Sequence, residues 1–441
     1  MKKILFLVDH KHRDFPAHCL IAYYLKKKGH RVYLRRLHEQ DVGLIQPDIL
    51  IENKLGRNPE YLKRINSWRR QKIKIVLIEN EGINQFSESK RKVSFKPDYA
   101  FFWNKNHGHI IEENFKYEVI GSPRTDFLLN KFRPIFKKKD EIIKNLNLDS
   151  NLKTISIAMH NSYEDLSDKK LNQMAKTRSF IYNEKFTFFD LVEHQRRTRE
   201  GLLNFVNDLI IKGLNYNVIL KPHPNDDINF WRDFEKKNPQ VKLMIGAPIN
   251  DLFCVSDLHI GKSGCSTIPE SYIYGLPNIE FKPLDKYSKF VVSKDHSNLA
   301  LFNVSNFNEI ELSINDIIQN QIPKKITDHR DQVMKNYISN YFHKIDGKRC
   351  LNYSERIDEI LTQKEKLNLI NIIKKASFRI FYFMKDFVNK YTRILLSKYY
   401  VERLIDKRGR YDSRISLNDE YSYYQKFDNL KFDQHKKEQN I

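Results

Sequence analysis

Short apolar segments alternate with helix-like segments along most of this 441-residue chain, and this alternation constrains the fold more than any other feature. Strand-like runs occupy residues 3–9 and 31–37, and the segment between them carries apolar side chains at helical spacing. Apolar strands separated by helices indicate a parallel sheet that is covered on both faces. Further strands of this first series are expected at residues 48–52, 73–79, 99–103 and 117–120.

A second series of the same kind follows a polar stretch. Its strands are expected at residues 154–159, 217–221, 241–245, 258–260 and 278–281. Helical residues 327–362 close it. Two Rossmann-like domains that face each other across a cleft bind ligands at the carboxyl ends of their strands. We therefore predict an α/β fold with an N-terminal Rossmann-like domain at residues 1–130, a linker at 131–152 and a C-terminal Rossmann-like domain at 153–362.

Composition narrows the class of protein and its surroundings. The four cysteines are scattered without a CxxC pair, which predicts neither a zinc site nor a disulfide framework and fits the reducing cytoplasm. No run of about 18 uncharged apolar residues is present, so a spanning helix is not expected. The turn after the first strand lacks GxGxxG, which disfavours a dinucleotide-binding dehydrogenase.

The net charge of +22 admits three kinds of partner: nucleic acid, an anionic membrane surface or a phosphorylated substrate. Residues 363–441 are predicted to form a basic, amphipathic helical tail. Within this tail, residues 364–410 hold 13 basic and 4 acidic side chains among apolar residues at helical spacing. Such a helix suits a bilayer interface rich in anionic lipid. The alternatives are packing of the tail on the body or on a second subunit, and binding to nucleic acid.

The sharpest chemical signal is the sequence VILKPHPN at residues 218–225. Two prolines end the strand and fix the backbone on either side of His223. Lys221 and His223 alternate at the carboxyl end of the strand, so both are expected near the mouth of the cleft. Together they can clamp a diphosphate or phosphodiester, and the imidazolium of His223 can protonate the departing phosphate oxygen. A proline-bounded loop with a surface histidine is the alternative reading, and Asp226 and Asp227 are expected to be solvated.

A second signal lies about forty residues later, in GKSGCSTIPES at residues 261–271. Glycines permit close approach of the backbone, hydroxyls donate hydrogen bonds, and a helix N-terminus supplies free N–H groups. This turn is therefore a candidate anion seat. Its spacing is not that of a Walker P-loop. Glu270 can bond the ribose hydroxyls of a nucleotide, although Pro269 and Glu270 also suit an ordinary helix start.

The pairing of KPHPN with GKSGCSTIPESYIYGLPNIEF resembles the nucleotide-binding half of GT-B glycosyltransferases. It is most similar to His-Pro-motif polysialyl and Kdo transferases and to CDP-glycerol glycerophosphotransferases. The segments ILFLVDHKHRDFPAHCLIAYYLKKKGHRV, IENEGI, GSPRTDF and IDGKRC are similar to a surface carbohydrate biosynthesis family from O-antigen and capsule gene clusters. The resemblance covers residues 1–362 and implies that Lys221 and His223 contact the donor phosphate. The other donor-binding residues that it implies are Ser263, Gly264, Ser266, Thr267 and Glu270.

Acceptor-binding residues are expected in the first domain, at the carboxyl ends of its strands. Glu79 and Glu81 follow the fourth strand, and either could instead cap the next helix. We prefer Glu81 as the catalytic carboxylate, which would deprotonate an acceptor hydroxyl or attack the anomeric carbon. His10 and Arg13 follow the first strand, and His160 follows the first strand of the second domain. All three are expected to line the cleft and bind the acceptor. The loop that carries His10, Arg13 and Asp14 could instead supply the base or be a solvated loop.

These residues favour a metal-independent glycosyltransferase of bacterial surface polysaccharide biosynthesis, of O-antigen, capsule or lipopolysaccharide, which needs no cofactor. We expect a nucleotide-activated donor, a CMP-linked acidic sugar or a CDP-activated substrate, and a glycan or lipid-linked acceptor. The expected location is cytoplasmic, peripheral on the inner face of the plasma membrane. A CDP-glycerol-type phosphotransferase or a UDP-sugar 2-epimerase are the alternatives on the same fold. A nucleic-acid-binding protein is the alternative from another class.

Overall fold

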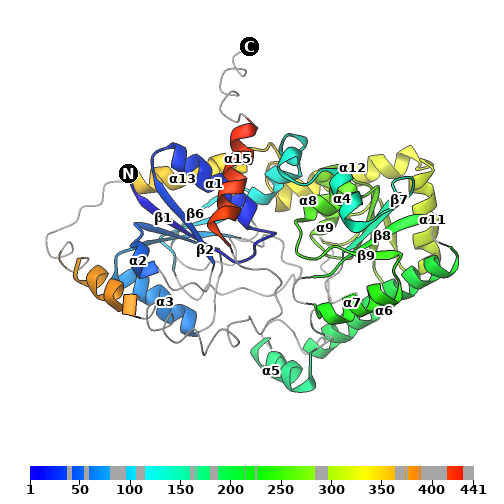
Figure 1. Ribbon diagram of the computed structural model, residues 1–441, viewed down its shortest axis with the longest axis horizontal. Coiled ribbons are helices and arrows are strands. Elements are labelled where there is room, and N and C mark those ends of the chain that lie inside the picture. The colour runs from blue at the N-terminus through cyan, green and yellow to red at the C-terminus, as the bar shows by residue number, and fades with distance from the viewer. Residues whose placement is uncertain are drawn as a thin grey trace, which may run out of the picture.

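The chain folds into two α/β domains that lie side by side, as the computed structural model in Figure 1 shows. In the described part of the chain each domain contains one six-stranded sheet, and neighbouring strands pair in parallel. The structure describes residues 1–36, 42–53, 59–79, 96–105, 115–158, 163, 166–178, 187–213, 215–223, 226–283, 296–362, 373, 376–385, 387–388 and 415–430.

The sheet of the first domain has the strand order β2-β1-β3-β4-β5-β6. Its central strands are apolar on both faces because both faces are covered. Phe6 and Ile51 pack into one buried cluster, whereas their neighbours Leu5 and Leu50 pack into another. The strands are β1 (Lys3–Val8), β2 (Arg31–Arg36), β3 (Ile49–Glu52), β4 (Lys74–Ile78), β5 (Tyr99–Phe102) and β6 (Lys116–Val119), and the helices are α1 (Phe15–Lys27), α2 (Val42–Ile45) and α3 (Pro59–Arg70).

The sheet of the second domain has the order β12-β11-β10-β7-β8-β9, so β7 pairs with both β8 and β10. Its strands are β7 (Lys153–Ala158), β8 (Tyr216–Lys221), β9 (Val241–Leu243), β10 (Leu258–Lys262), β11 (Asn278–Phe281) and β12 (Phe302–Val304). Its helices are α5 (Asp168–Arg178), α6 (Phe188–Ile211), α7 (Ile228–Lys237), α8 (Ile249–Val255), α9 (Thr267–Tyr274), α11 (Phe307–Ile318) and α12 (Lys324–Tyr341).

These two sheets confirm the predicted fold class of two Rossmann-like domains. The predicted strands agree with the observed ones to within two residues at each end. The sequence did not predict β12 or α11. The strand β12 consists of only three residues with Asn303 at its centre, so no apolar run marks it.

The chain crosses between the domains twice. The first crossing consists of the 3₁₀ helices η2 (Pro123–Leu128) and η3 (Asn130–Ile135), followed by α4 (Lys139–Leu146). The second leads from α12 to α13 (Arg349–Thr362), which returns to the first domain beside α1. Tyr353 and Ile357 of α13 are buried in the same cluster as Phe6 and Leu20. The sequence-based boundaries group α13 with the second domain, whereas it packs in the core of the first.

The carboxylate of Asp126 joins the two crossings. Asp126 lies in η2 and is 1% exposed. Its oxygens accept hydrogen bonds from the backbone N–H groups of Arg349, at 3.1 Å, and Cys350, at 2.8 Å, at the start of α13. The Arg349 guanidinium then donates to the carbonyl of Ile120 at 2.7 Å. Burial raises the pKa of Asp126 to about 6, and the two N–H groups oppose that rise.

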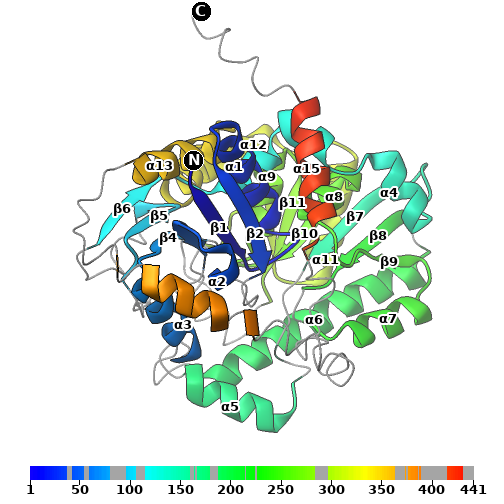
Figure 2. The same ribbon diagram turned by 60° about the vertical axis from the view of Figure 1, so that its left-hand side comes forward.

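Two parts of the predicted tail are described. Residues 376–385 and 387–388 are helical, within the segment predicted as an amphipathic helix. A later helix, α15 (Leu417–Asn429), lies against α1 in both views (Figures 1 and 2). Phe427 is fully buried there, and Glu420 pairs with Lys26 at 2.7 Å. This part of the tail therefore packs on the first domain.

We predict that Asp126→Ala lowers the free energy of unfolding by about 2–4 kcal/mol, because two buried N–H groups lose an ionised acceptor. Urea unfolding at pH 7.5, where Asp126 is ionised, measures the change. Asp140→Ala is the matched control, since Asp140 is an exposed aspartate in the first turn of α4; its effect should stay within about 0.5 kcal/mol. Equal effects of the two substitutions would contradict this role of Asp126.

Candidate active site

Both sequence motifs of the second domain lie at one edge of its sheet. The strands β7, β8 and β10 are neighbours and parallel, so their carboxyl ends lie together. The strand β7 pairs with β10 although two strands intervene in the sequence, which makes this the point where the strand order reverses. Open α/β sheets bind ligands at such a point. Lys221 ends β8, and Lys262 ends β10.

The Pro-His-Pro turn is held by a buried carboxylate. Asp226 is 6% exposed, and its side chain accepts a hydrogen bond from the backbone N–H of His223 at 2.9 Å. Its own N–H donates to the carbonyl of His223 at 2.9 Å. The expectation that Asp226 is solvated was therefore wrong, because it closes the turn that carries His223. Asp227 is the residue before α7, and its side chain accepts from the N–H of Asn229 at 2.9 Å.

Lys221 is a partly buried cation at the end of β8. Its Nζ donates to the carbonyl oxygen of Ala247 at 2.5 Å. Burial lowers the pKa of Lys221 to about 8, while the charge of Asp251 opposes the decrease. The group is therefore mostly charged at pH 7, and a nearby anion would favour this form.

The predicted anion seat is a tight turn between β10 and α9. The strand extends two residues beyond its predicted end, to Lys262, and the turn then passes through Gly264 with φ of +74°. The backbone N–H of Ser263 donates a hydrogen bond to the carbonyl of Phe281 at 2.9 Å. The turn thus brings four predicted donor-binding residues together, namely Ser263, Gly264, Ser266 and Thr267.

A buried histidine that the sequence did not reveal supports this turn. His259 lies in β10 and is 0% exposed. Its Nε2 is 2.9 Å from the hydroxyl of Thr267, and its Nδ1 is 3.1 Å from the hydroxyl of Ser156. Burial lowers the pKa of His259 to about 3, so the ring is neutral. The Thr267 hydroxyl also donates to Sγ of Cys265 at 3.2 Å, and these bonds hold the start of α9 in place.

Glu270 joins the seat to the first domain. Its carboxylate is 3.3 Å from the guanidinium of Arg124, and the side chains are 9% and 15% exposed. Burial raises the pKa of Glu270, and the charges of Arg124 and Arg13 oppose the rise. The same Arg124 guanidinium lies over the ring of Trp103, with 4.7 Å to the ring centroid. The residue predicted to bind ribose thus forms an ion pair between the domains.

The turn after β1 is organised by its own side chains. The Nδ1 atom of His10 accepts hydrogen bonds from the backbone N–H groups of His12, at 3.2 Å, and Arg13, at 3.1 Å. The guanidinium of Arg13 donates to both carboxylate oxygens of Asp14, at 2.9 and 3.0 Å. His10 and Arg13, both predicted to bind the acceptor, therefore lie in one turn. That turn also approaches the second domain, because His12 faces Gly246.

Glu79 lies at the end of β4 and is 5% exposed. Its Oε2 accepts from the backbone N–H of Trp103 at 3.2 Å, and its carbonyl accepts from the indole N–H of Trp103 at 2.8 Å. The predicted catalytic Glu81 and the predicted acceptor-binding His160 lie outside the described residues.

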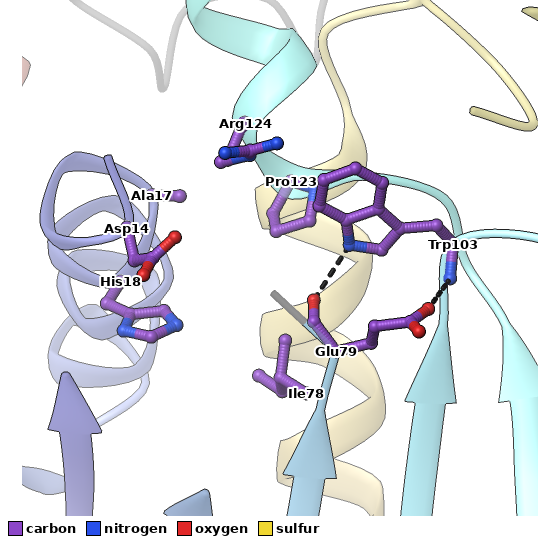
Figure 3. A pocket seen from close by; sticks show the side chains of 8 residues that line it. All are labelled: Asp14, Ala17, His18, Ile78, Glu79, Trp103, Pro123 and Arg124. Atoms are coloured by element: carbon purple, nitrogen blue, oxygen red, sulfur yellow. Dashed lines mark hydrogen bonds between the residues drawn. The ribbon is translucent and has the colours of Figure 1, made fainter. Parts of the chain in front are cut away.

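A small pocket lies at the carboxyl ends of β4 and β5 (Figure 3). Asp14, the N-cap residue of α1, and His18 line one side, Glu79 and Trp103 line the other, and Arg124 lies above them. Sequence reasoning placed Asp14 on the same rim as His10 and Arg13 and named Glu79, but it missed His18, Trp103 and Arg124. A signal was present for His18, which lies four residues after Asp14 at the start of the helix that follows the first strand.

Two polar atoms around this pocket are buried and lack a hydrogen-bond partner among the described residues. They are Nδ1 of His18 and Nε of Arg124. Burial lowers the pKa of His18 to about 4, although the Asp14 charge opposes the decrease, so the ring is neutral at pH 7. A ligand hydroxyl or oxygen at the pocket would satisfy such atoms. The part of the chain that is described holds no cluster of three or more His, Cys, Asp or Glu side chains suited to a metal ion.

Comparisons with known proteins bear on the fold. No protein-family model and no curated protein matches the chain. A histidine-to-asparagine variant of the wall teichoic acid polymerase TagF, soaked with CDPG, is 15% identical over 82% of this chain and 89% of that chain, with a TM-score of 0.51. A histidine-to-alanine variant of TagF is 14% identical over 83% and 90% of the two chains, again with a TM-score of 0.51.

A structure of MnaA from S. aureus with UDP is 13% identical over 83% of this chain and 99% of that chain, with a TM-score of 0.49. The likeness that bears on this chain is the one to TagF, with TM-scores of 0.51. At 14–15% identity it shows the fold alone. That fold is the pair of Rossmann-like domains predicted from the sequence.

We predict that Arg124 and Glu270 are energetically coupled. A double-mutant cycle with Arg124→Ala and Glu270→Gln, followed by urea unfolding, should give a coupling free energy of about 1–3 kcal/mol, since both groups are mostly buried. Lys153 and Asp257 have the same 3.3 Å separation, but their side chains are 58% and 25% exposed. A cycle on that exposed pair should give less than about 1 kcal/mol. Coupling no larger for Arg124 and Glu270 would contradict a link between the domains.

Proposed function

We propose that the protein is a glycosyltransferase of surface polysaccharide biosynthesis that uses a nucleotide-activated donor. The observation that carries the proposal is the convergence of Lys221, His223 and the turn at residues 263–267 at the carboxyl edge of the second sheet. A partly buried cation, a histidine whose backbone N–H is held by Asp226 and a helix N-terminus suit the phosphates of a nucleotide. The fold shared with TagF supports the same class.

The proposed donor is a CMP-linked acidic sugar or another cytidine-activated substrate. In the reaction, an acceptor hydroxyl attacks the anomeric carbon, and the bond from that carbon to the nucleotide phosphate breaks. A carboxylate of the first domain takes the hydroxyl proton, and His223 gives a proton to the leaving phosphate oxygen. Glu81 remains our proposed base. Among the described residues Asp14 and Glu79 line the pocket on the acceptor side.

No metal or cofactor is required in this scheme. Lys221 and the N–H groups at the start of α9 stabilise charge on the leaving phosphate by fixed dipoles and charge. Arg124 and the neutral ring of His18 can bind acceptor oxygens at the pocket. The acceptor is a glycan or a lipid-linked saccharide, and the basic tail brings the enzyme to the cytoplasmic face of an anionic membrane.

A CDP-glycerol-type phosphotransferase is the second candidate. It is favoured by the fold shared with the CDPG-soaked polymerase, and the same phosphate site would serve it. An acceptor-dependent release of CMP from CMP-sugars supports the first candidate. Release from CDP-glycerol supports the second, and conversion of a UDP-sugar without any acceptor would favour an epimerase.

We predict that His223→Ala reduces kcat by about 10²–10⁴-fold, because the leaving phosphate loses its proton donor. Nucleotide release in the presence of acceptor measures it. His329→Ala is the matched control, since His329 is an exposed histidine on α12, and it should keep full activity. Near-full turnover of a folded His223→Ala variant would overturn the assignment of His223.

We also predict that donor affinity falls as the pH rises through about 8. Lys221 is charged below its pKa of about 8 and neutral above it. Because a bound phosphate favours the charged form, the Kd for CDP should rise by about tenfold per pH unit above 8. Titration calorimetry between pH 8 and 10, where the phosphates of CDP no longer titrate, measures this slope. Lys221→Gln should bind weakly with a flat profile, and an unchanged slope in that variant would exclude Lys221 as its source.

A further inference from the structure

An exposed apolar helix lies on the outside of the first domain. Among the described residues, fifteen large hydrophobic side chains are exposed, and eight of them fall within residues 373–388. The other seven are scattered, and they are Met1, Tyr117, Phe189, Ile211, Leu312, Leu417 and Tyr421. Isolated exposed hydrophobic residues are common, whereas a cluster of this kind marks a binding surface. The eight are Ile373, Phe378, Ile380, Phe381, Phe383, Met384, Phe387 and Val388.

The apolar side of this helix points away from the protein. At 100° per residue, four of the five that lie in the continuous stretch 376–385, all except Phe378, fall on one broad side of the helix. Arg379 and Tyr382 lie on the other side, and they are the two residues of the described segment that are partly buried. The Arg379 guanidinium donates to the carbonyl of Pro47 at 3.2 Å and to Asp48 at 3.4 Å. The helix is therefore attached through its polar side, which leaves the apolar side exposed.

Basic side chains are exposed on a neighbouring helix. The helix lies beside α2 and α3 in both views (Figures 1 and 2). The exposed side chains of α3 include Lys63, Arg69 and Arg70, and Lys385 is exposed on the helix itself. Aromatic and aliphatic side chains flanked by Lys and Arg match a bilayer interface with anionic headgroups. In the described part of the chain, no helix is long and apolar enough to cross a bilayer.

We propose that the apolar side of residues 373–388, together with the basic side chains of α3, is the surface that lies on an anionic membrane. This inference rests on the membrane role proposed above for the tail and specifies its contact surface. Asp48 directly precedes β3 and accepts from the N–H of Lys3 at 3.0 Å, so the helix is attached at the amino ends of β1 and β3. The candidate active site lies at the carboxyl ends.

The test measures sedimentation of the full-length protein with vesicles of phosphatidylglycerol and phosphatidylcholine, compared with vesicles of phosphatidylcholine alone. Replacing Ile380 and Met384 by Glu should lower the partition coefficient for the anionic vesicles by about tenfold or more, since charge cannot enter the interface. The matched control replaces Ile211 and Leu312 by Glu. These two residues lie in the second domain and are 81% and 65% exposed. It should bind as the unchanged protein does.

The outcomes test the membrane surface independently of the proposed transferase activity. Equal binding of both double variants, or no preference for anionic vesicles, would overturn the proposed surface. A change of oligomeric state in the Ile380 and Met384 variant, without a change in vesicle binding, would assign the surface to a second copy of the chain and overturn the proposal. A loss of single-stranded DNA binding, without a change in vesicle binding, would assign the surface to nucleic acid and also overturn it. CDP affinity is measured on the same samples. It should be unchanged, because the helix does not reach the carboxyl ends of the strands, so failure of either proposal is visible independently.

Discussion

The arrangement of the two domains depends on one buried carboxylate. The chain leaves the first domain through η2 and returns through α13, and Asp126 on the outward crossing accepts both leading N–H groups of the returning helix. A buried carboxylate requires such donors, and a helix N-terminus supplies them. Because α13 then packs into the core of the first domain, this contact holds together the two chain segments that enter and leave the second domain. Trp103, stacked on Phe342, and Arg124, paired with Glu270, are further contacts across the same boundary.

Burial also determines the chemistry of the site. His18 and Glu270 are buried and Lys221 is partly buried, and in each case burial is the main cause of the shift in pKa. Burial destabilises the charged form of each group, and it strengthens the interaction of that group with an oppositely charged or polar ligand. Satisfied networks such as Thr267 with His259 hold the turn in shape. The buried nitrogens of His18 and Arg124 that have no partner in the described residues mark where a ligand would add most.

The sequence predicts those parts of the protein that depend on local pattern. VILK followed by Pro-His-Pro is recognised because an apolar run ends at a residue that cannot continue it, and the anion seat because glycines and hydroxyls precede a helix. The interactions that remained hidden depend on tertiary structure. Arg124 and Glu270 are 146 positions apart, and nothing local to either residue indicates the pair. The sequence around Asp226 is typical of an exposed loop, and its burial depends on the folded turn. The pocket beside Asp14 and His18 forms only when β4, β5 and η2 pack next to them.

The central claim is that the second domain holds a cytidine nucleotide at Lys221, His223 and the turn at residues 263–267. The most direct test is a thermal-shift measurement with CMP, CDP, UDP, UMP, GDP and ADP on the unchanged protein and on Lys221→Gln. A ligand at 100 times its Kd should add about 2.7 kcal/mol to the free energy of unfolding. The account predicts the largest shift with CMP or CDP and its loss in the variant. No shift with any nucleotide, or an equal shift in the variant, would contradict it.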